Sequence, residues 1–69
     1  MKILTMDLHY PNKNYRDNSI LMVIESGVVK EVTCIKPFDT IVGFQTELQK
    51  HLDYFKLKYP GIKILEEKG

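Results

Sequence analysis

Two pairs of side chains have the types and the spacing of metal ligands. Asp7 and His9 lie two residues apart, on one face of a strand, and Glu47 and His51 lie four apart, on one face of a helix. Carboxylates and imidazoles bind divalent metals, so the two pairs could share an ion if strand and helix brought them together. The apolar stripe of the helix places Glu47 on its outer side, however, and we therefore expect no metal and no other cofactor.

The sequence contains no recognisable nucleophile or phosphate site. It has no glycine-rich phosphate loop and no HExxH, CxxC or GxSxG motif, and neither Ser19 nor Ser26 has a sequence context that activates a hydroxyl. Cys34 falls on the strand face that we expect to be buried, where a thiol behaves as a small hydrophobic group. These observations disfavour catalysis.

Length and composition predict one small intracellular domain, residues 1–69. A single cysteine allows no intrachain disulfide, which favours a reducing, cytoplasmic setting. No apolar run is long enough to cross a membrane, and no basic and apolar leader is present. The net charge is +1 and nine lysines accompany one arginine, which argues against a dedicated nucleic-acid binder because arginine suits phosphate and guanine best. Preference for lysine is also typical of A/T-rich coding sequences, as in low-G/C bacteria and their phages.

Residues 39–59 are predicted to form one long helix. Asp39 or Thr40 can cap its start, and the pair Pro60-Gly61 ends it. Gly43 in the first turns indicates either a late helix start or a close approach of another element. Apolar residues recur every three or four positions and need a sheet to pack on. They are Ile41, Phe44, Leu48, Leu52, Phe55 and Tyr59.

The remaining chain is predicted to form strands and loops. Residues 2–10 alternate, with Leu4, Met6, Leu8 and Tyr10 on the core side. A surface loop follows at 11–19, then an entirely apolar strand at 20–24, a three-residue hairpin turn at 25–27 with Gly27 left-handed, and a strand at 28–36. A short last strand covers 62–65. The fold class is therefore α+β: a three-stranded antiparallel meander, one long α-helix on one sheet face and a short C-terminal strand.

The hairpin turn predicts which residues share a face of the sheet. With a three-residue turn, one face carries Ile20, Met22, Ile24, Val28, Val32 and Cys34. If the helix covers that face, nothing in the chain covers the other, and an uncovered apolar face usually marks an interface. We therefore expect self-association through Leu21, Val23, Val29 and Ile35. A slip of one residue would exchange the two faces.

Two further places have side chains suited to a protein partner. Tyr15 and Arg16 lie in the loop and are residue types enriched in binding hot spots, whereas a plain exposed loop is the simpler interpretation. Tyr54 and Leu57 interrupt the polar outer side of the helix, although scattered apolar residues are normal on any surface. These four residues are our candidates for partner binding.

The order of elements also resembles a known family. The segment Asp7-Leu8-His9-Tyr10 is similar to the first-strand Asp-x-x-Tyr of endonuclease V, and Gly43-Phe44 before Glu47 is similar to that family's helix entry. The chain thus resembles the opening half of a ribonuclease H-like domain, although Glu47 follows Gly43 more closely than in that family. The resemblance implies that Asp7, Glu47 and Glu66 would bind a metal.

Two functional hypotheses follow. The leading one is a small non-enzymatic protein-binding module, a homo-oligomer that inhibits or modulates a larger protein; its size and composition suit a phage or mobile-element protein. The alternative, which depends on the resemblance, is a reduced ribonuclease H-like metal-dependent nuclease or nucleic-acid-binding protein. A small-ligand-sequestering oligomer is a third possibility, for which the sequence offers no phosphate-binding motif.

Overall fold

The protein has one helix and a four-stranded sheet. The computed structural model describes residues 1–14 and 16–68, and for residues 66–68 it describes the backbone alone. The elements in chain order are β1 (Lys2–Leu8), β2 (Ser19–Glu25), β3 (Val28–Ile35), α1 (Ile41–Lys58) and β4 (Lys63–Lys68). This confirms a small α+β protein with the predicted order of elements.

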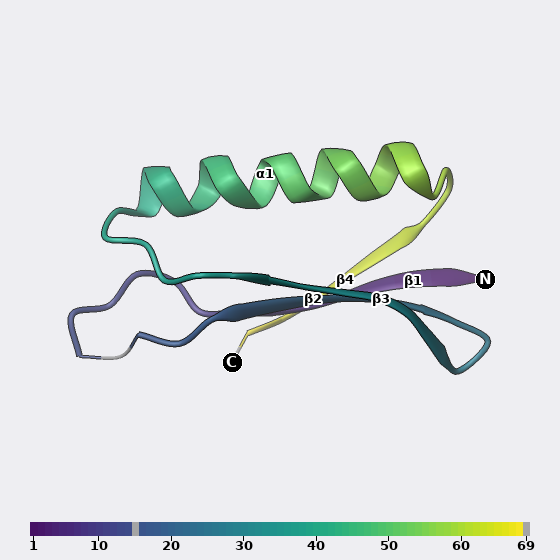
Figure 1. The fold of residues 1–69 in the computed structure, drawn as a ribbon, viewed down its shortest axis with the longest axis horizontal. Coiled ribbons are helices and arrows are strands. Elements are labelled where there is room, and N and C mark those ends of the chain that lie inside the picture. Colours follow the sequence, from purple (N-terminus) through teal and green to yellow (C-terminus); the bar gives the residue numbers. More distant parts are fainter. Residues whose placement is uncertain (15, 69) are drawn as a thin grey trace.

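The sheet is mixed, with strand order β3-β2-β1-β4. Strand β2 pairs antiparallel with both β1 and β3, whereas β4 pairs parallel with β1. Because β3 and β4 form opposite edges, α1 crosses the whole sheet between them and covers one side of it (Figure 1). The C-terminal strand therefore completes the sheet rather than lying apart from the meander.

The hydrophobic core is a single layer between α1 and the sheet. The predicted alternation in β1 is confirmed, since Leu4, Met6 and Leu8 are buried in the core. Tyr10, also predicted on that side, lies past the end of β1 and is partly exposed, with its ring 5.0 Å from that of Phe44. The buried residues are Leu4, Met6, Leu8, Leu21, Val23, Ile35, Phe44 and Phe55.

The prediction of which face of β2 lies under the helix is wrong. Leu21 and Val23 are fully buried against α1, and Ile35 is buried with them. The register explains this result: Met6 pairs with Leu21 and Leu4 with Val23, so the core side of β1 continues into the odd positions of β2. Leu21, Val23 and Ile35 are therefore core residues and not an interface.

The same exchange of faces moves Cys34 to the surface. It is exposed and pairs with Ile20, which is also exposed, so the expectation of a buried thiol is wrong. In β2 every residue from Ile20 to Ile24 is aliphatic, and such a run carries no alternation that would identify the inner side.

The hairpin between β2 and β3 differs from the predicted one. Ser26 and Gly27 both have positive φ, 52° and 77°, and form a two-residue turn between the paired residues Glu25 and Val28. A register shift follows, because Ile24 pairs with Val29 while Val23 pairs with Glu31. The bulge leaves one extra residue in β3 and turns Val29 to the side of the sheet away from α1.

The ends of α1 agree with the predicted signals. Thr40 is the N-cap, and its Oγ1 accepts a hydrogen bond of 3.0 Å from the backbone N of Gly43. A Cβ on Gly43 would lie 3.0 Å from that Oγ1 and 3.1 Å from the ring of Phe38, so the glycine permits a close approach. The helix ends at Tyr59, just before Pro60. Ile41, predicted in the buried stripe, is the first helical residue and is exposed.

Candidate functional site

The side of the sheet away from α1, here called the open face, carries several exposed apolar side chains on neighbouring strands. In the described part of the chain no helix or strand lies on it, as Figure 1 shows for the space on the far side of the sheet from the helix. Strand pairing arranges its side chains in three rows from β3 to β4. The rows are Val29, Ile24, Ile3 and Lys63; Val32, Met22, Thr5 and Leu65; and Cys34, Ile20 and Asp7.

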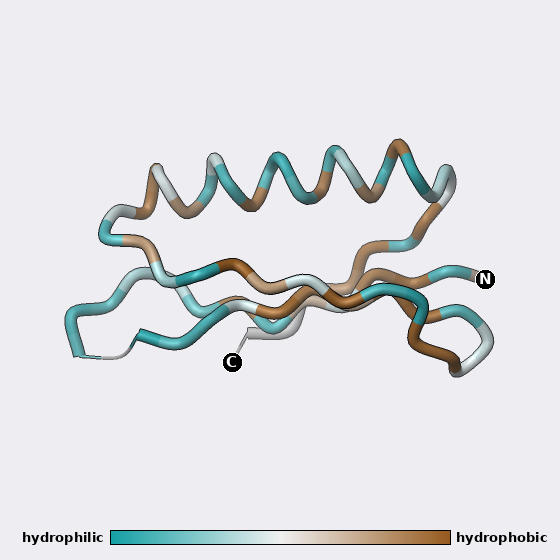
Figure 2. The backbone as a smooth tube through the Cα atoms, viewed as in Figure 1, coloured by the Kyte–Doolittle hydropathy of each residue, from teal (hydrophilic) through white to brown (hydrophobic). Residues whose placement is uncertain are grey.

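Polar and apolar side chains occupy different parts of the open face. The two charged groups described on it, Asp7 and Lys63, belong to β1 and β4. The residues that strand pairing places on this face in β2 and β3 are uncharged, and we call them the apolar half: Ile20, Met22, Ile24, Val29, Val32 and Cys34. In Figure 2 hydrophobic colouring covers much of these two strands and is interrupted by hydrophilic stretches.

Several aliphatic side chains of the open face are in contact with water. Val29 is 50% exposed, Val32 53%, Ile20 38% and Leu65 41%. Single exposed aliphatic residues are common, but several neighbouring aliphatic residues exposed on one face of a sheet are typical of an interaction surface. The arrangement has no polar group suited to catalysis at its centre, and what it can do is exclude water against another apolar surface.

The residues proposed as metal ligands do not gather at one site. Asp7 lies on the open face, where its Oδ1 is 3.5 Å from Nε2 of His9. Glu47 lies on α1, on the other side of the sheet, and pairs with His51 at 3.4 Å and with Lys50 at 3.9 Å. The side chain of Glu66 lies outside the described residues. Among the residues whose side chains are described, no group of three or more potential ligands is present.

Ser19 has a structural function. Its side chain is buried, and its Oγ accepts a hydrogen bond of 2.8 Å from the backbone N of His9. The bond joins the end of β1 to the start of β2, where the loop between them begins and ends. This agrees with the absence of an activating sequence context around the serine.

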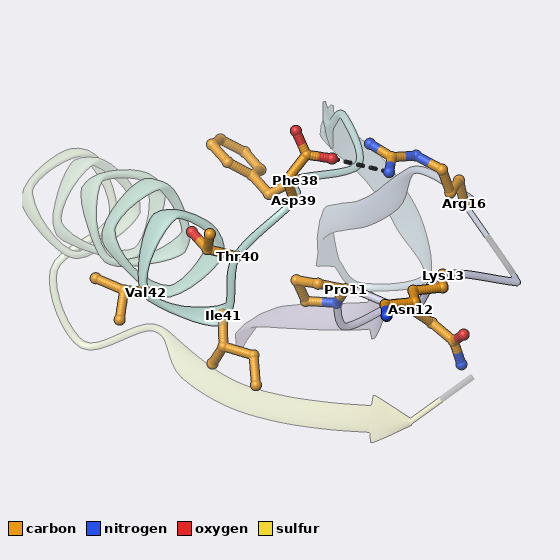
Figure 3. Close-up of a pocket in the computed structure, with 9 residues that line it drawn as sticks. All are labelled: Pro11, Asn12, Lys13, Arg16, Phe38, Asp39, Thr40, Ile41 and Val42. Atoms are coloured by element: carbon orange, nitrogen blue, oxygen red, sulfur yellow. Dashed lines mark ion pairs between the residues drawn. The ribbon is translucent and has the colours of Figure 1, made fainter.

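A hollow of about 600 Å³ lies between the loop after β1 and the start of α1 (Figure 3). Arg16, one of the predicted contact residues, borders it and reaches Asp39 with a 2.9 Å ion pair between Nη1 and Oδ1. Both side chains are exposed, so the ion pair contributes little to stability. Tyr15, its predicted companion, lies outside the described residues. The hollow is where the loop rests against the helix entry.

A polar cluster, which we call the Glu31 cluster, joins the edge strand β3 to the last turns of α1. Oε1 of Glu31 accepts hydrogen bonds from Nζ of Lys58 at 2.9 Å and from the hydroxyl of Tyr59 at 2.8 Å. Its Oε2 accepts one of 3.0 Å from the hydroxyl of Tyr54. Tyr54, predicted to contact a partner, is therefore engaged within the chain, although its ring stays partly exposed.

The cluster changes the acidity of its members. Hydrogen bonds from Lys58, and next from Tyr59, lower the pKa of Glu31 below its ordinary value. The hydrogen bond to Tyr54, followed by that to Glu31, raises the pKa of Lys58. Donation to Glu31 raises the pKa of Tyr59. The partners are 23 to 28 residues apart in sequence, so no local pattern could have revealed the cluster.

Leu57 is the most exposed large apolar residue of α1, at 85%. It directly precedes Lys58 of the Glu31 cluster in sequence, and its side chain does not belong to the core. It remains a candidate for partner binding, as Arg16 does.

Comparison with known proteins gives no relative. No family model, no curated protein and no solved structure matches the chain. Within the described residues, no helix has the length and apolar character needed to cross a membrane. The functional argument therefore depends on the chemistry of the surfaces described above.

Proposed function

We propose that this chain is a small non-enzymatic protein-binding module, and that the open face of its sheet is the surface by which it binds. The observation that carries the proposal is the apolar half of that face, six uncharged side chains on two adjacent strands with no helix or strand of the described residues over them. The module would act by occupying the surface of another protein chain and so modulating it.

The energetics of the apolar half support binding rather than catalysis. Covering a half-exposed aliphatic side chain contributes of the order of 1 kcal/mol, and Val29, Val32 and Ile20 are each exposed to about that extent. The backbone groups of β2 are already paired with both neighbouring strands, so covering this strand leaves none of them without a partner. An apolar partner surface can therefore pack there without a compensating polar cost.

The test combines solution mass with binding of an apolar fluorescent dye. The wild-type chain should either exceed its 8.1 kDa mass in light scattering or, as a monomer, bind the dye. Val32→Lys places a charge in the apolar half and should abolish whichever signal the wild type gives. Gln45→Lys places the same charge at an exposed polar position of α1, on the other side of the sheet, and should change neither signal. A monomer that binds no dye would refute the proposal.

A further inference from the structure

We infer that the partner on the open face is a second copy of this chain, and that the two copies are related by a two-fold axis passing close to Met22. The inference rests on the proposed function, because it takes the open face as the binding surface. It adds the identity of the occupant and the residues that meet.

The distribution of charge on the open face favours a second copy. The apolar half contains no charged side chain, whereas Asp7 and Lys63 lie in the columns of β1 and β4. An axis near Met22 that runs along β2 places β2 against β2, with Met22, Ile20 and Ile24 each meeting its own counterpart in the second copy. Aliphatic side chains then cover aliphatic side chains along the whole central strand.

The neighbouring strands also meet suitable partners under this axis. Strand β3 of each copy lies over β1 of the other, so that Val32 faces Thr5, Val29 faces Ile3 and Cys34 faces Asp7. Asp7 falls at a corner of the contact and Lys63 outside it, where both charges stay in water. No charge is buried without a partner, which is the condition that an apolar interface must meet.

Long-range electrostatics do not oppose the association. The formal net charge is +1 per chain, so two copies repel each other only weakly at ordinary ionic strength. To select a polar or charged partner, the apolar half would have to present charged or hydrogen-bonding groups, and it has none apart from the weak donor of Cys34. The apolar half of a second copy needs no such group to pack against it.

The area of the open face that two copies can share determines how strongly we expect them to associate. Strands about 4.8 Å apart, with seven residues of about 3.3 Å each, give about 330 Å² of projected area for the three strands that overlap. The whole molecule extends 37 × 21 Å across its two longer axes, which sets the upper limit of any face that two copies could share. Two copies thus form an interface at or below the lower end for specific complexes, about 1,000 to 1,200 Å² of accessible surface. We therefore expect a dissociation constant in the micromolar range.

The experiment is sedimentation equilibrium of the full chain from low micromolar to several hundred micromolar. The mass should rise from 8.1 kDa toward twice that value. Val32→Lys should remain at 8.1 kDa over the whole range, and the matched control Gln45→Lys, at an exposed position of α1, should behave as the wild type. Circular dichroism of each variant shows whether it is folded, and Val32 is exposed enough to accept a lysine in the monomer.

A crosslinking measurement tests the position of the axis. In a Cys34→Ser background, Met22→Cys should be joined to its counterpart by a bifunctional maleimide that spans the roughly 10 Å between packed sheets. Leu57→Cys in the same background should not be joined. Failure of Met22→Cys to crosslink at concentrations where the mass has doubled would refute the axis.

The outcomes separate this inference from the proposed function. A chain that stays at 8.1 kDa at the highest concentration but binds the apolar dye through its open face would overturn the second copy and leave the binding module, with a different protein as occupant. A monomer that binds no dye would overturn both. A dimer that Val32→Lys leaves intact would show that the copies meet elsewhere, which also overturns the inference.

Discussion

Leu21 and Ile20 are neighbours in an aliphatic strand and have opposite surroundings. Leu21 is fully buried between β1, β3 and α1, whereas Ile20 is 38% exposed on the open face. Pleating turns successive side chains to opposite sides, so removing carbon atoms from the two residues has different consequences. At position 21 a truncation leaves a cavity, and at position 20 it removes surface that water already reaches.

The first prediction compares Leu21→Ala with Ile20→Ala. Leu21→Ala should lower the free energy of unfolding by about 2 to 5 kcal/mol, as other buried leucine truncations do. Ile20→Ala should cost about 1 kcal/mol or less in the monomer. Urea unfolding of both variants in the Val32→Lys background measures the two effects without a contribution from association. A larger loss at Ile20 than at Leu21 would contradict the register.

The same pair of residues explains how far the fold follows from the sequence. The alternation of Leu4, Met6 and Leu8 with polar neighbours identified the core side of β1, and Thr40 and Pro60 bounded the helix, because these signals are local. The inner face of β2 has no local signal. It depends on pairing with a distant strand, and an error of one residue in the turn was enough to exchange the faces.

At the scale of elements, the Glu31 cluster determines how the end of α1 is held to the edge of the sheet. Glu31 projects toward the helix from β3 and binds Tyr54, Lys58 and Tyr59 in two successive turns. The core residue Phe55 lies between these positions and is fully buried, so the cluster closes the core at that end. The site proposed for binding is on the other side of the sheet and does not include the cluster.

The second prediction concerns the pH dependence of this attachment. The pKa of Glu31 is lowered from 4.5 in the folded chain, so its contribution to stability is present above about pH 4.5 and is lost as the pH falls through the lowered value. The pKa values of Lys58 and Tyr59 are raised from 10.5 and 10.0, so their contribution is present below about pH 10 and is lost as the pH rises through the raised values. The cluster should therefore stabilise the fold from about pH 5 to 10.

Glu31→Gln provides the measurement. Its midpoint of thermal unfolding should lie below that of the wild type at pH 7, and the difference should shrink below pH 4.5, where the wild-type carboxyl becomes neutral as well. Glu47→Gln is the matched control, because the two ion pairs of Glu47 among the described residues lie within α1, and its loss should cost about 0.5 kcal/mol or less. A constant difference from pH 7 to pH 3 would mean that the charge of Glu31 does not matter.

At the scale of the whole molecule, the fold has two layers and one uncovered side. A 69-residue chain buries a smaller fraction of its surface than a larger domain does, and among the described residues one helix forms the second layer. Two copies joined through their open faces would form a four-layer arrangement, with the sheets inside and the helices outside. The association would give the chain the second core that its own length cannot supply.

This arrangement predicts that stability depends on protein concentration. If dissociation accompanies unfolding, a higher protein concentration shifts the equilibrium toward the folded dimer by mass action. With an unfolding enthalpy of about 0.7 kcal/mol per residue, each tenfold rise in concentration should raise the melting temperature by about 5 °C. Calorimetry at about 10, 100 and 1,000 micromolar protein measures this change in melting temperature. Val32→Lys should melt at one temperature throughout, because its charged open face excludes the second copy, whereas Gln45→Lys should keep the full dependence. A wild-type melting temperature that does not change with concentration would contradict the prediction, because it would mean that association does not stabilise the fold.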